Sequence, residues 1–192
     1  MTDESRSYIV FIDETGFMLA PVLKRTWAPR GKTPILKISN PHGRISVIGA
    51  MTLQRDTFEF GFYFHLLEDN ANFNGNSVAN FVAQINKLLN SPMTLVWDEY
   101  GIHRAKPVKE YLRKNPTIEA EEFPPYAPEL NPVDYVWSYV KYGRLANYCP
   151  RNLAELRLRV TQELTRVAQQ SNLLRALFSR TGLPLSKERL PN

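Results

Sequence analysis

Three aspartates stand where their carboxylates could act together on a bound metal ion. Asp13 and Asp98 each follow a short apolar run, and Asp134 lies within the proline-rich stretch FPPYAPELNPVDYVW. Magnesium prefers oxygen ligands and keeps several waters, so it needs few protein carboxylates when a substrate phosphate supplies the remaining ligands. Two such ions about 3.5–4 Å apart stabilise the attacking and leaving oxygens of an in-line phosphoryl displacement. If the three acids converge, they predict a two-metal site for phosphodiester chemistry.

Each aspartate also has an ordinary structural explanation. Aspartate is common where a strand gives way to a turn, which would account for Asp13 and Asp98 separately. Asn131 suits a helix N-cap, Pro132 suits the first helical turn, and Asp134 stands where a capping-box acid would stand. The residues leave both interpretations open, although the three acids in this order favour a shared site more than any one does.

The elements that must bring the acids together follow from hydrophobic periodicity. The run YIVFI (residues 8–12) predicts a buried strand that delivers Asp13 at its carboxyl end. Thr15 and Gly16 predict a turn after it, with residues 17–19 returning as a second strand. Asn76 or Ser77 is the expected cap of the first helix.

The remaining elements alternate between strands and helices. The early strands are expected to be antiparallel and the later ones to be joined through helices, which predicts an α/β fold with a mixed sheet flanked by helices on both faces. Strands are expected at residues 44–53, 57–64, 93–97 and 118–123, and helices at 77–89, 107–114, 132–145 and 152–170.

The bulk composition predicts one domain and a polyanionic partner. A chain of 192 residues without repeats or a Gly/Ser linker suits a single domain, with a core at about 8–145 and a helical extension at about 150–180. The net charge of +5 favours a polyanion. One cysteine excludes an internal disulfide framework and fits a reducing cytosol, and no apolar run approaches the roughly 20 residues that span a bilayer.

Four stretches of the chain closely resemble the catalytic domain of DDE transposases, in particular bacterial insertion-sequence enzymes related to the mariner superfamily. The resemblance covers roughly residues 8–145 and implies an RNase H-like fold. It also implies hydrolysis of DNA at transposon ends followed by strand transfer, with Asp13, Asp98 and Asp134 as catalytic ligands of Mg²⁺ or Mn²⁺. The four stretches are FIDETGF, TWAPRGKTP, VWDEYGIHRAK and PPYAPELNPVDYVWSYVK.

The chain departs from the family pattern in two side chains and in its N-terminal region. The third acid is aspartate, as in mariner-type enzymes, where many insertion-sequence relatives have glutamate. Glu99 stands where relatives often have asparagine, and could serve as an auxiliary ligand or perturb metal binding. Only seven residues precede the first strand, so no N-terminal DNA-recognition domain is expected in this chain.

The same resemblance implies partners and a location. If the chain is one product of a split gene, a separately encoded part would supply DNA recognition; the alternatives are a truncated product, a fragment or a remnant. The protein would act on transposon ends and target DNA as a homodimer or higher assembly. It would be cytoplasmic in a bacterium, associated with the nucleoid when bound to DNA, and it would not bind a membrane.

Two groups of residues are candidate DNA contacts. Cationic and aromatic side chains together suit phosphate contacts and base stacking. The first group is Arg25, Trp27, Arg30 and Lys32, and the second is His103, Arg104, Lys106 and Lys141. The alternative for the first group is a solvated hairpin with a packed tryptophan. The alternatives for the second group are a structural histidine and a charged solvent face.

Two other functions are compatible with the same residues. The chain could be a catalytically silent DNA-binding or assembly module derived from a transposase, or a nuclease that performs no strand transfer. Intact acids argue against the first, and strand-transfer products would exclude the second.

Overall fold

The computed structural model describes residues 7–32, 34–36, 42–125 and 127–185. Thr33 and Tyr126, which belong to two of the family-like stretches, lie outside the described residues, as do residues 1–6 before the first strand. The strands are β1 (Tyr8–Met18), β2 (Arg44–Gln54), β3 (Phe60–Leu66), β4 (Met93–Trp97) and β5 (Ile118–Glu122). The helices are α1 (Gly75–Leu89), α2 (Lys106–Lys114), α3 (Pro132–Ser138), α4 (Leu153–Ala168) and α5 (Ser171–Ser179), with a 3₁₀ turn η1 (Pro128–Leu130) and a π-helical segment η2 (Tyr139–Arg144).

The five strands form one mixed sheet in the order β3-β2-β1-β4-β5. The pairs β1–β2 and β2–β3 are antiparallel, whereas β1–β4 and β4–β5 are parallel. Parallel neighbours need a crossover connection, and α1 and α2 provide the ones that precede β4 and β5. The predicted sheet, antiparallel early and helix-linked late, is confirmed.

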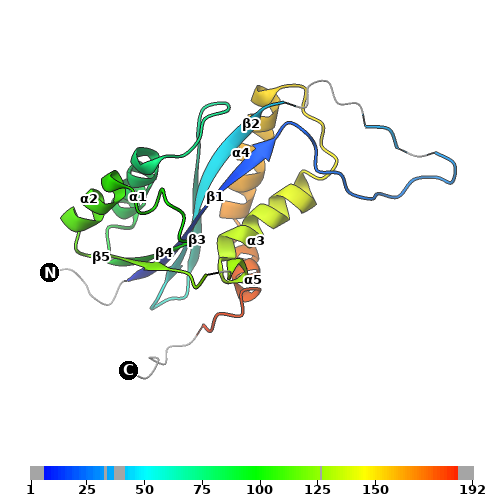
Figure 1. Ribbon diagram of the computed structural model, residues 1–192. Helices are drawn as coiled ribbons and strands as arrows, with labels where there is room; N and C mark the ends of the chain where they lie inside the picture. The colour runs from blue at the N-terminus through cyan, green and yellow to red at the C-terminus, as the bar shows by residue number, and fades with distance from the viewer. Residues whose placement is uncertain (1–6, 33, 37–41, 126, 186–192) are drawn as a thin grey trace.

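Helices cover both faces of this sheet, as the sequence predicted (Figure 1). One core lies between the sheet and α1 with α2, and the other lies between the sheet and α3, α4 and α5. The side chains of β1 alternate between the two cores: Val10 and Ile12 belong to the first and Phe11 to the second. Among the described residues, no helix is long and apolar enough to cross a bilayer.

Strand β1 is longer than the sequence predicted. It runs without a break from Tyr8 to Met18, so Asp13 lies in its middle, and the expected turn at Thr15 and Gly16 was wrong. The reason is that β2 pairs with every residue of β1, from Tyr8 opposite Gln54 to Met18 opposite Arg44. This continuous ladder satisfies the backbone groups that a turn would have used.

Other boundaries differ by a few residues for local reasons. Strand β3 begins at Phe60 rather than at residue 57, because Phe58 adopts a left-handed conformation with φ of 55°. The cap of α1 is Asn74, which forms a capping box with Ser77, so the expected caps were wrong. The helix expected at 132–145 changes at Tyr139 into η2.

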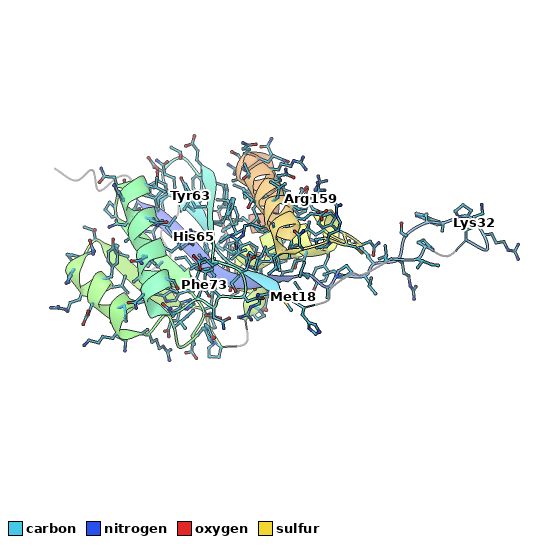
Figure 2. All side chains as sticks on the ribbon, turned by 90° about the horizontal axis from the view of Figure 1, so that it is seen from above. Met18, Lys32, Tyr63, His65, Phe73 and Arg159 are labelled. Atoms are coloured by element: carbon cyan, nitrogen blue, oxygen red, sulfur yellow. The ribbon has the colours of Figure 1, made fainter. Side chains whose placement is uncertain are left out.

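The described part of the connection between β1 and β2 projects from the body of the molecule as a long arm, with Lys32 near its far end (Figures 1 and 2). Its root is closed by a bond from Leu19 N to the backbone oxygen of Gly43 at 2.9 Å. Asn147 holds the first part of the arm, since its side chain accepts from Lys24 N and donates to the Lys24 backbone oxygen, each at 2.8 Å. The arm is therefore anchored to the segment between η2 and α4.

Candidate active site

Asp13 and Asp98 are brought together by the parallel pairing of β1 and β4. The last paired residues of these strands are Phe11 and Val96, and each aspartate stands two residues beyond them. Beyond this point β1 continues alongside β2, whereas β4 ends at Trp97. The acids therefore lie where one strand leaves its neighbour, a place where α/β sheets commonly bind ligands.

Asp134 approaches the same edge from the first turn of α3. Asn131 caps this helix by accepting from Val133 N at 3.1 Å, and its side-chain nitrogen donates to the backbone oxygen of Ile12 at 3.2 Å. One buried asparagine thus ties the helix start to the residue before Asp13. The Asn131 side chain accepts from Val133 N and not from Asp134 N, so the described residues show no capping box and the capping explanation for Asp134 is not supported.

A cavity of about 430 Å³ joins the three aspartates. Asp13, Asp98 and Asp134 all line it, with Glu99 beside them. The described part of the proline-rich loop forms the rest of its wall, through Phe123, Pro124, Pro125, Ala127 and Pro128. This rigid loop therefore both positions the start of α3 and shapes the space in front of the acids.

Asp13 and Asp134 form a repelling pair. Burial, followed by the charges of Asp134 and Glu14, raises the pKa of Asp13 well above its usual value, although the Trp137 hydrogen bond lowers it in part. Burial also raises the pKa of Asp134, against the opposing hydrogen bond from Asp13 and the charge of Lys141. Two carboxylates this close favour one shared proton, and a cation between them would remove the repulsion.

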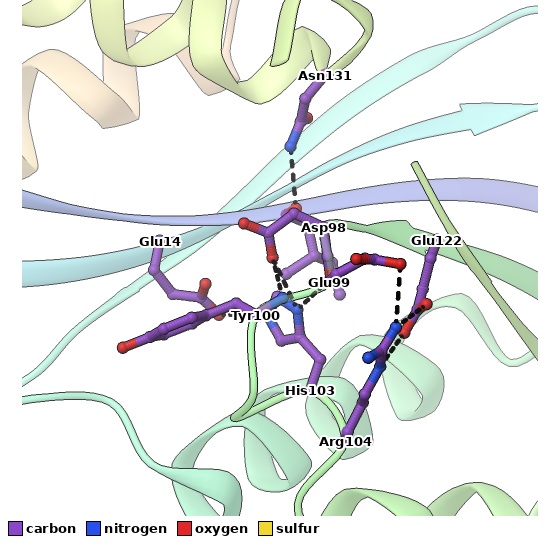
Figure 3. A network of polar contacts seen from close by, with 9 residues as sticks. Glu14, Asp98, Glu99, Tyr100, His103, Arg104, Glu122 and Asn131 are labelled. Atoms are coloured by element: carbon purple, nitrogen blue, oxygen red, sulfur yellow. Dashed lines mark hydrogen bonds and ion pairs between the residues drawn. The ribbon is translucent and has the colours of Figure 1, made fainter. Parts of the chain in front are cut away.

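Asp98 is held by a buried histidine (Figure 3). His103 Nδ1 lies 3.0 Å from the backbone oxygen of Asp98 and 3.1 Å from Asp98 Oδ1, and His103 Nε2 lies 3.1 Å from Glu14 Oε1. Carbonyl and carboxylate oxygens accept hydrogen bonds, so an imidazolium, which donates from both ring nitrogens, would satisfy these contacts. The imidazole stacks on Trp97 with 4.7 Å between ring centroids.

The pKa values agree with this protonation state. Burial lowers the pKa of His103, but hydrogen bonds to Asp98 and Glu14 outweigh it and raise the pKa to about 10. The His103 hydrogen bond in turn lowers the pKa of Asp98, against the opposing effect of burial. Asp98 is therefore ionised and oriented at neutral pH.

His103 is only 3% exposed, which favours the structural alternative, and its predicted contact with DNA stays a prediction. Its position between Glu14 and Asp98 makes it a positioning residue for the second aspartate. The sequence could not distinguish the two roles, because Glu14 is far from His103 along the chain.

Lys141 lies beside the carboxylate pair, and its predicted contact with DNA stays a prediction. Its ammonium group donates to Thr15 Oγ1 and lies 5.3 Å from the centroid of the Phe17 ring. Burial lowers the pKa of Lys141, and the charges of Asp13 and Asp134 oppose that shift. Lys141 thus supplies positive charge close to the Asp13 and Asp134 carboxylates.

The other predicted contacts lie outside the cavity. Arg25, Trp27, Arg30 and Lys32 are exposed on the arm, and Trp27 is 101% exposed, so the packed-tryptophan alternative is not supported.

Arg104 and Lys106 are not among the residues that line the cavity, and both are paired with carboxylates. Arg104 binds both carboxylate oxygens of Glu122 and lies 3.3 Å from Glu99 Oε1. Lys106 lies 3.8 Å from Glu110. Glu99 therefore lines the cavity while its carboxylate pairs with Arg104.

Trp137, Glu14 and Asn131 belong to the site although the sequence did not mark them as site residues. Trp137 Nε1 donates to Asp13 Oδ2 at 2.7 Å. A helical spacing of three residues places Trp137 and Asp134 on one face of α3. Trp137, Glu14 and Asn131 also lie within the family-like stretches FIDETGF and PPYAPELNPVDYVWSYVK, which was a second signal in the sequence.

The residues fit a divalent metal by their chemistry. The pair Asp13–Asp134 has an unfavourable concentration of negative charge. The Tyr100 backbone nitrogen and His103 Nδ1 both approach Oδ1 of Asp98, which leaves Oδ2 for another ligand. The fit is one of chemistry and not of distance, because the described part of the chain contains no group of three or more His, Cys, Asp or Glu side chains close enough together to hold one metal ion.

Comparison with known proteins agrees with this fold. The Mos1 transposase paired-end complex with left transposon end matches at 17% sequence identity with a TM-score of 0.65. The Mos1 mariner paired end complex with Mn matches at 17% sequence identity with a TM-score of 0.63. Each of these two matches covers 91% of this chain and 53% of the other chain. The catalytic domain of Mos1 mariner transposase matches at 16% identity with a TM-score of 0.59, covering 91% of this chain and 78% of that one. The chain thus spans about half the length of the paired-end transposase chains. No curated protein matches in sequence.

The structural likeness confirms the predicted RNase H-like α/β fold. At the level of sequence, residues 8–157 match the family described as DDE superfamily endonuclease. This match covers most of the 192 residues and includes all three aspartates of the cavity, so the chain belongs to the DDE superfamily of endonucleases.

Proposed function

We propose that this chain is the catalytic domain of a DDE-type transposase. It hydrolyses DNA phosphodiester bonds at transposon ends, and a freed 3′-hydroxyl then attacks target DNA by the same in-line chemistry. The observation that carries the proposal is the common cavity of Asp13, Asp98 and Asp134, three acids from three different elements.

Asp13, Asp98 and Asp134 are the residues that would hold two Mg²⁺ or Mn²⁺ ions. When bound, such ions lower the pKa of a water and neutralise charge that develops on the phosphate. Crystal structures of the Mos1 mariner paired end complex carry Mn in one case and Mg in another, which supports the choice of metals.

The chain's own side chains orient these ligands. Trp137 fixes one oxygen of Asp13, and His103 with the Tyr100 backbone nitrogen fixes Oδ1 of Asp98. Asn131 ties the start of α3 to β1, and this bond fixes the position of Asp134 relative to the strand. Such outer contacts hold metal ligands in the geometry that catalysis needs.

The finer parts of the proposal concern partners and origin. DNA is the substrate, and Arg25, Trp27, Arg30 and Lys32 on the exposed arm are its contacts away from the cavity. The protein acts as a homodimer or higher assembly on DNA, with a separately encoded recognition part. It comes from a bacterial insertion sequence and works in the cytoplasm at the nucleoid.

A plasmid-nicking assay tests the proposed function. Supercoiled plasmid is incubated with the protein and Mn²⁺, beside Asp98→Asn and, as a matched carboxylate control, Glu119→Gln on the exposed edge strand β5. We expect Asp98→Asn to lose nicking by at least about 100-fold, since even residues that only orient a ligand typically cost 10–100-fold. Glu119→Gln keeps wild-type activity.

The alternatives give different results in the same assay. Equal nicking by wild type and Asp98→Asn overturns the metal-site assignment. DNA binding without nicking in either protein supports a catalytically silent module. Nicking without joined products, when a duplex with a free 3′-hydroxyl is added, indicates a nuclease without strand transfer.

A further inference from the structure

Three arginines that do not line the catalytic cavity converge on one buried glutamate. Glu163 of α4 has a side chain that is 1% exposed. Arg144 Nε lies 2.8 Å from its Oε2, and Arg166 and Arg159 lie 2.8 Å and 3.1 Å from its Oε1. The three arginine side chains remain partly open to solvent, with exposures of 43%, 51% and 34% for Arg144, Arg166 and Arg159.

This arginine cluster (Arg144, Arg159 and Arg166) carries an excess of positive charge. Within the described part of the chain, every ion pair of these three residues goes to Glu163, which leaves two formal positive charges without an acid. A guanidinium has five N–H donors in a planar fork, and one carboxylate engages only a few of them. Further donors of the cluster are therefore left for a second anion.

Other arginines in this region are paired one to one. Arg151 lies 3.2 Å from Glu155, and Arg157 lies 2.7 Å from Asp69. Each of these pairs is electrically neutral, so the excess in the arginine cluster is a local property and not a general feature of the helix.

The bonds to Glu163 by themselves do not require three arginines. The bond from Arg144 joins η2 to α4, so a single pair would secure that packing. Arg159 and Arg166 stand four residues before and three residues after Glu163 on the same helix, so their bonds to Glu163 stay within α4. Arg159 also lies over the Tyr148 ring, 5.7 Å from its centroid, whereas Arg166 makes no such ring contact within the described residues. Like charges held this close repel one another, so a second anion would stabilise the cluster.

We propose that Arg144, Arg159 and Arg166 form a binding site for the phosphodiester backbone of duplex DNA, separate from the catalytic cavity. The inference rests on the proposed function, because it takes DNA as the substrate. Arginine forks match phosphate oxygens in a bidentate geometry, and a backbone contact of this kind is independent of base sequence.

The position of the cluster suits a duplex whose scissile phosphate lies at the aspartates. Arg144 follows Asp134 by ten residues along α3 and η2, which corresponds to roughly 15 Å of helix. This span is about four phosphate spacings along one strand at about 3.4 Å each. Figure 2 shows Arg159 on α4, toward the side from which the arm with Lys32 projects.

Salt-dependent binding of a labelled duplex tests this site. The probe is a fluorescein-labelled 30-base-pair duplex of arbitrary sequence, titrated with the full chain in EDTA so that no cleavage occurs. The test variant is Arg159→Gln with Arg166→Gln. The matched control is Arg151→Gln with Arg157→Gln, which removes the same charge from the same region but only from neutral pairs.

We expect the test variant to reduce the slope of log K against log salt by about 0.9 for each DNA phosphate that it no longer neutralises, and to weaken two unrelated duplexes equally. The control keeps a slope close to that of wild type. Thermal unfolding of each variant shows whether it is folded. If Arg159→Gln with Arg166→Gln is unfolded, Arg166→Gln alone is compared with Arg151→Gln.

Equal slopes for the test variant and the control overturn the proposed site. The proposed site is also overturned if the test variant no longer binds a poly-glutamate peptide but binds DNA as wild type does; that result indicates an acidic protein partner. Different results would overturn the proposed function: wild type that does not bind the duplex, or nicking that does not depend on Asp98.

Discussion

Trp137 Nε1 lies 2.7 Å from Asp13 Oδ2 and donates a hydrogen bond to it. This bond joins two elements of the site, because Trp137 stands one helical turn after Asp134 on α3 and Asp13 lies within β1. The helix that carries the third aspartate thus also orients the first. The indole ring therefore holds the relative position of the two carboxylates together with the bond from Asn131 to the Ile12 backbone oxygen.

Replacing Trp137 with phenylalanine should reduce activity more than it reduces stability. The variant keeps an aromatic ring in the core but removes the donor to Asp13. We expect Mn²⁺-dependent nicking to slow by roughly 10- to 100-fold, the range typical of residues that orient a metal ligand. Nicking rates across a Mn²⁺ titration, together with thermal unfolding, check this. Activity that falls only in proportion to stability would assign Trp137 a packing role alone.

Gly49→Ala should displace the Trp137 indole through a clash with the new methyl group. Gly49 faces Asp13 in the β1–β2 register, and a Cβ there would lie 2.7 Å from Trp137 Cη2 and 3.0 Å from Phe62 Cζ. Overpacking of this kind typically costs about 1–3 kcal/mol. Urea unfolding measures the change, with Gly143→Ala as control, because no described atom lies within 4 Å of a Cβ at that position. Equal stability of the two variants contradicts the prediction.

His103→Gln should remove a pH-dependent contribution to stability. The pKa of His103 rises from 6.5 to about 10, so the folded state binds the proton more tightly than the unfolded chain does. The contribution is therefore complete below about pH 6.5 and is lost as the pH rises through about 10. Urea unfolding of wild type and variant between pH 6 and pH 10.5 should give a difference that shrinks steadily. A difference independent of pH would mean that the ring is neutral.

Asp13→Asn should stabilise the protein in EDTA. The raised pKa of Asp13 means that ionising this carboxyl costs the folded state more than the unfolded chain, so stability falls as the pH rises from the ordinary value of 3.8 towards the raised pKa. Asparagine cannot ionise and still offers an oxygen to Trp137. We expect a gain of about 0.5–2 kcal/mol at neutral pH, the usual range for a stabilising substitution. Thermal unfolding at pH 4 and pH 7 checks that the gain is larger at pH 7.

Mn²⁺ should raise the melting temperature of wild type. A ligand present at 100 times its Kd stabilises the folded state by about 2.7 kcal/mol, and about 1 kcal/mol corresponds to roughly 2–4 °C in a domain of this size. Asp98→Asn should show a much smaller shift, and Glu119→Gln the full shift. An equal shift in both variants would place the metal elsewhere.

Much of the fold could be predicted from local patterns. The apolar runs at residues 8–12 and 93–97 indicated buried strands, because a strand covered on both faces needs apolar side chains in both directions. The order of strands and helices then restricted the sheet to a mixed one. The capping role of Asn131 was also predictable, since it depends only on residues next to it in the chain.

The tertiary structure decided the features that depend on partners distant in sequence. Strand β1 continues through Asp13 because β2 pairs along its whole length, and no local pattern in residues 13–18 indicates that pairing. His103 is buried because Glu14 and Asp98 meet around it, and Glu163 gathers Arg144 from outside its own helix.

The sequence by itself therefore determined which carboxylates this protein has and which elements carry them. Only the tertiary structure decided that Asp13, Asp98 and Asp134 share one cavity and that Trp137, His103 and Asn131 hold their surroundings in place. The physical reason is that periodicity and capping arise from neighbours in the chain. The approach of β1, β4 and α3 depends instead on sheet register and on the packing of two cores, and both involve residues that are far apart in the sequence.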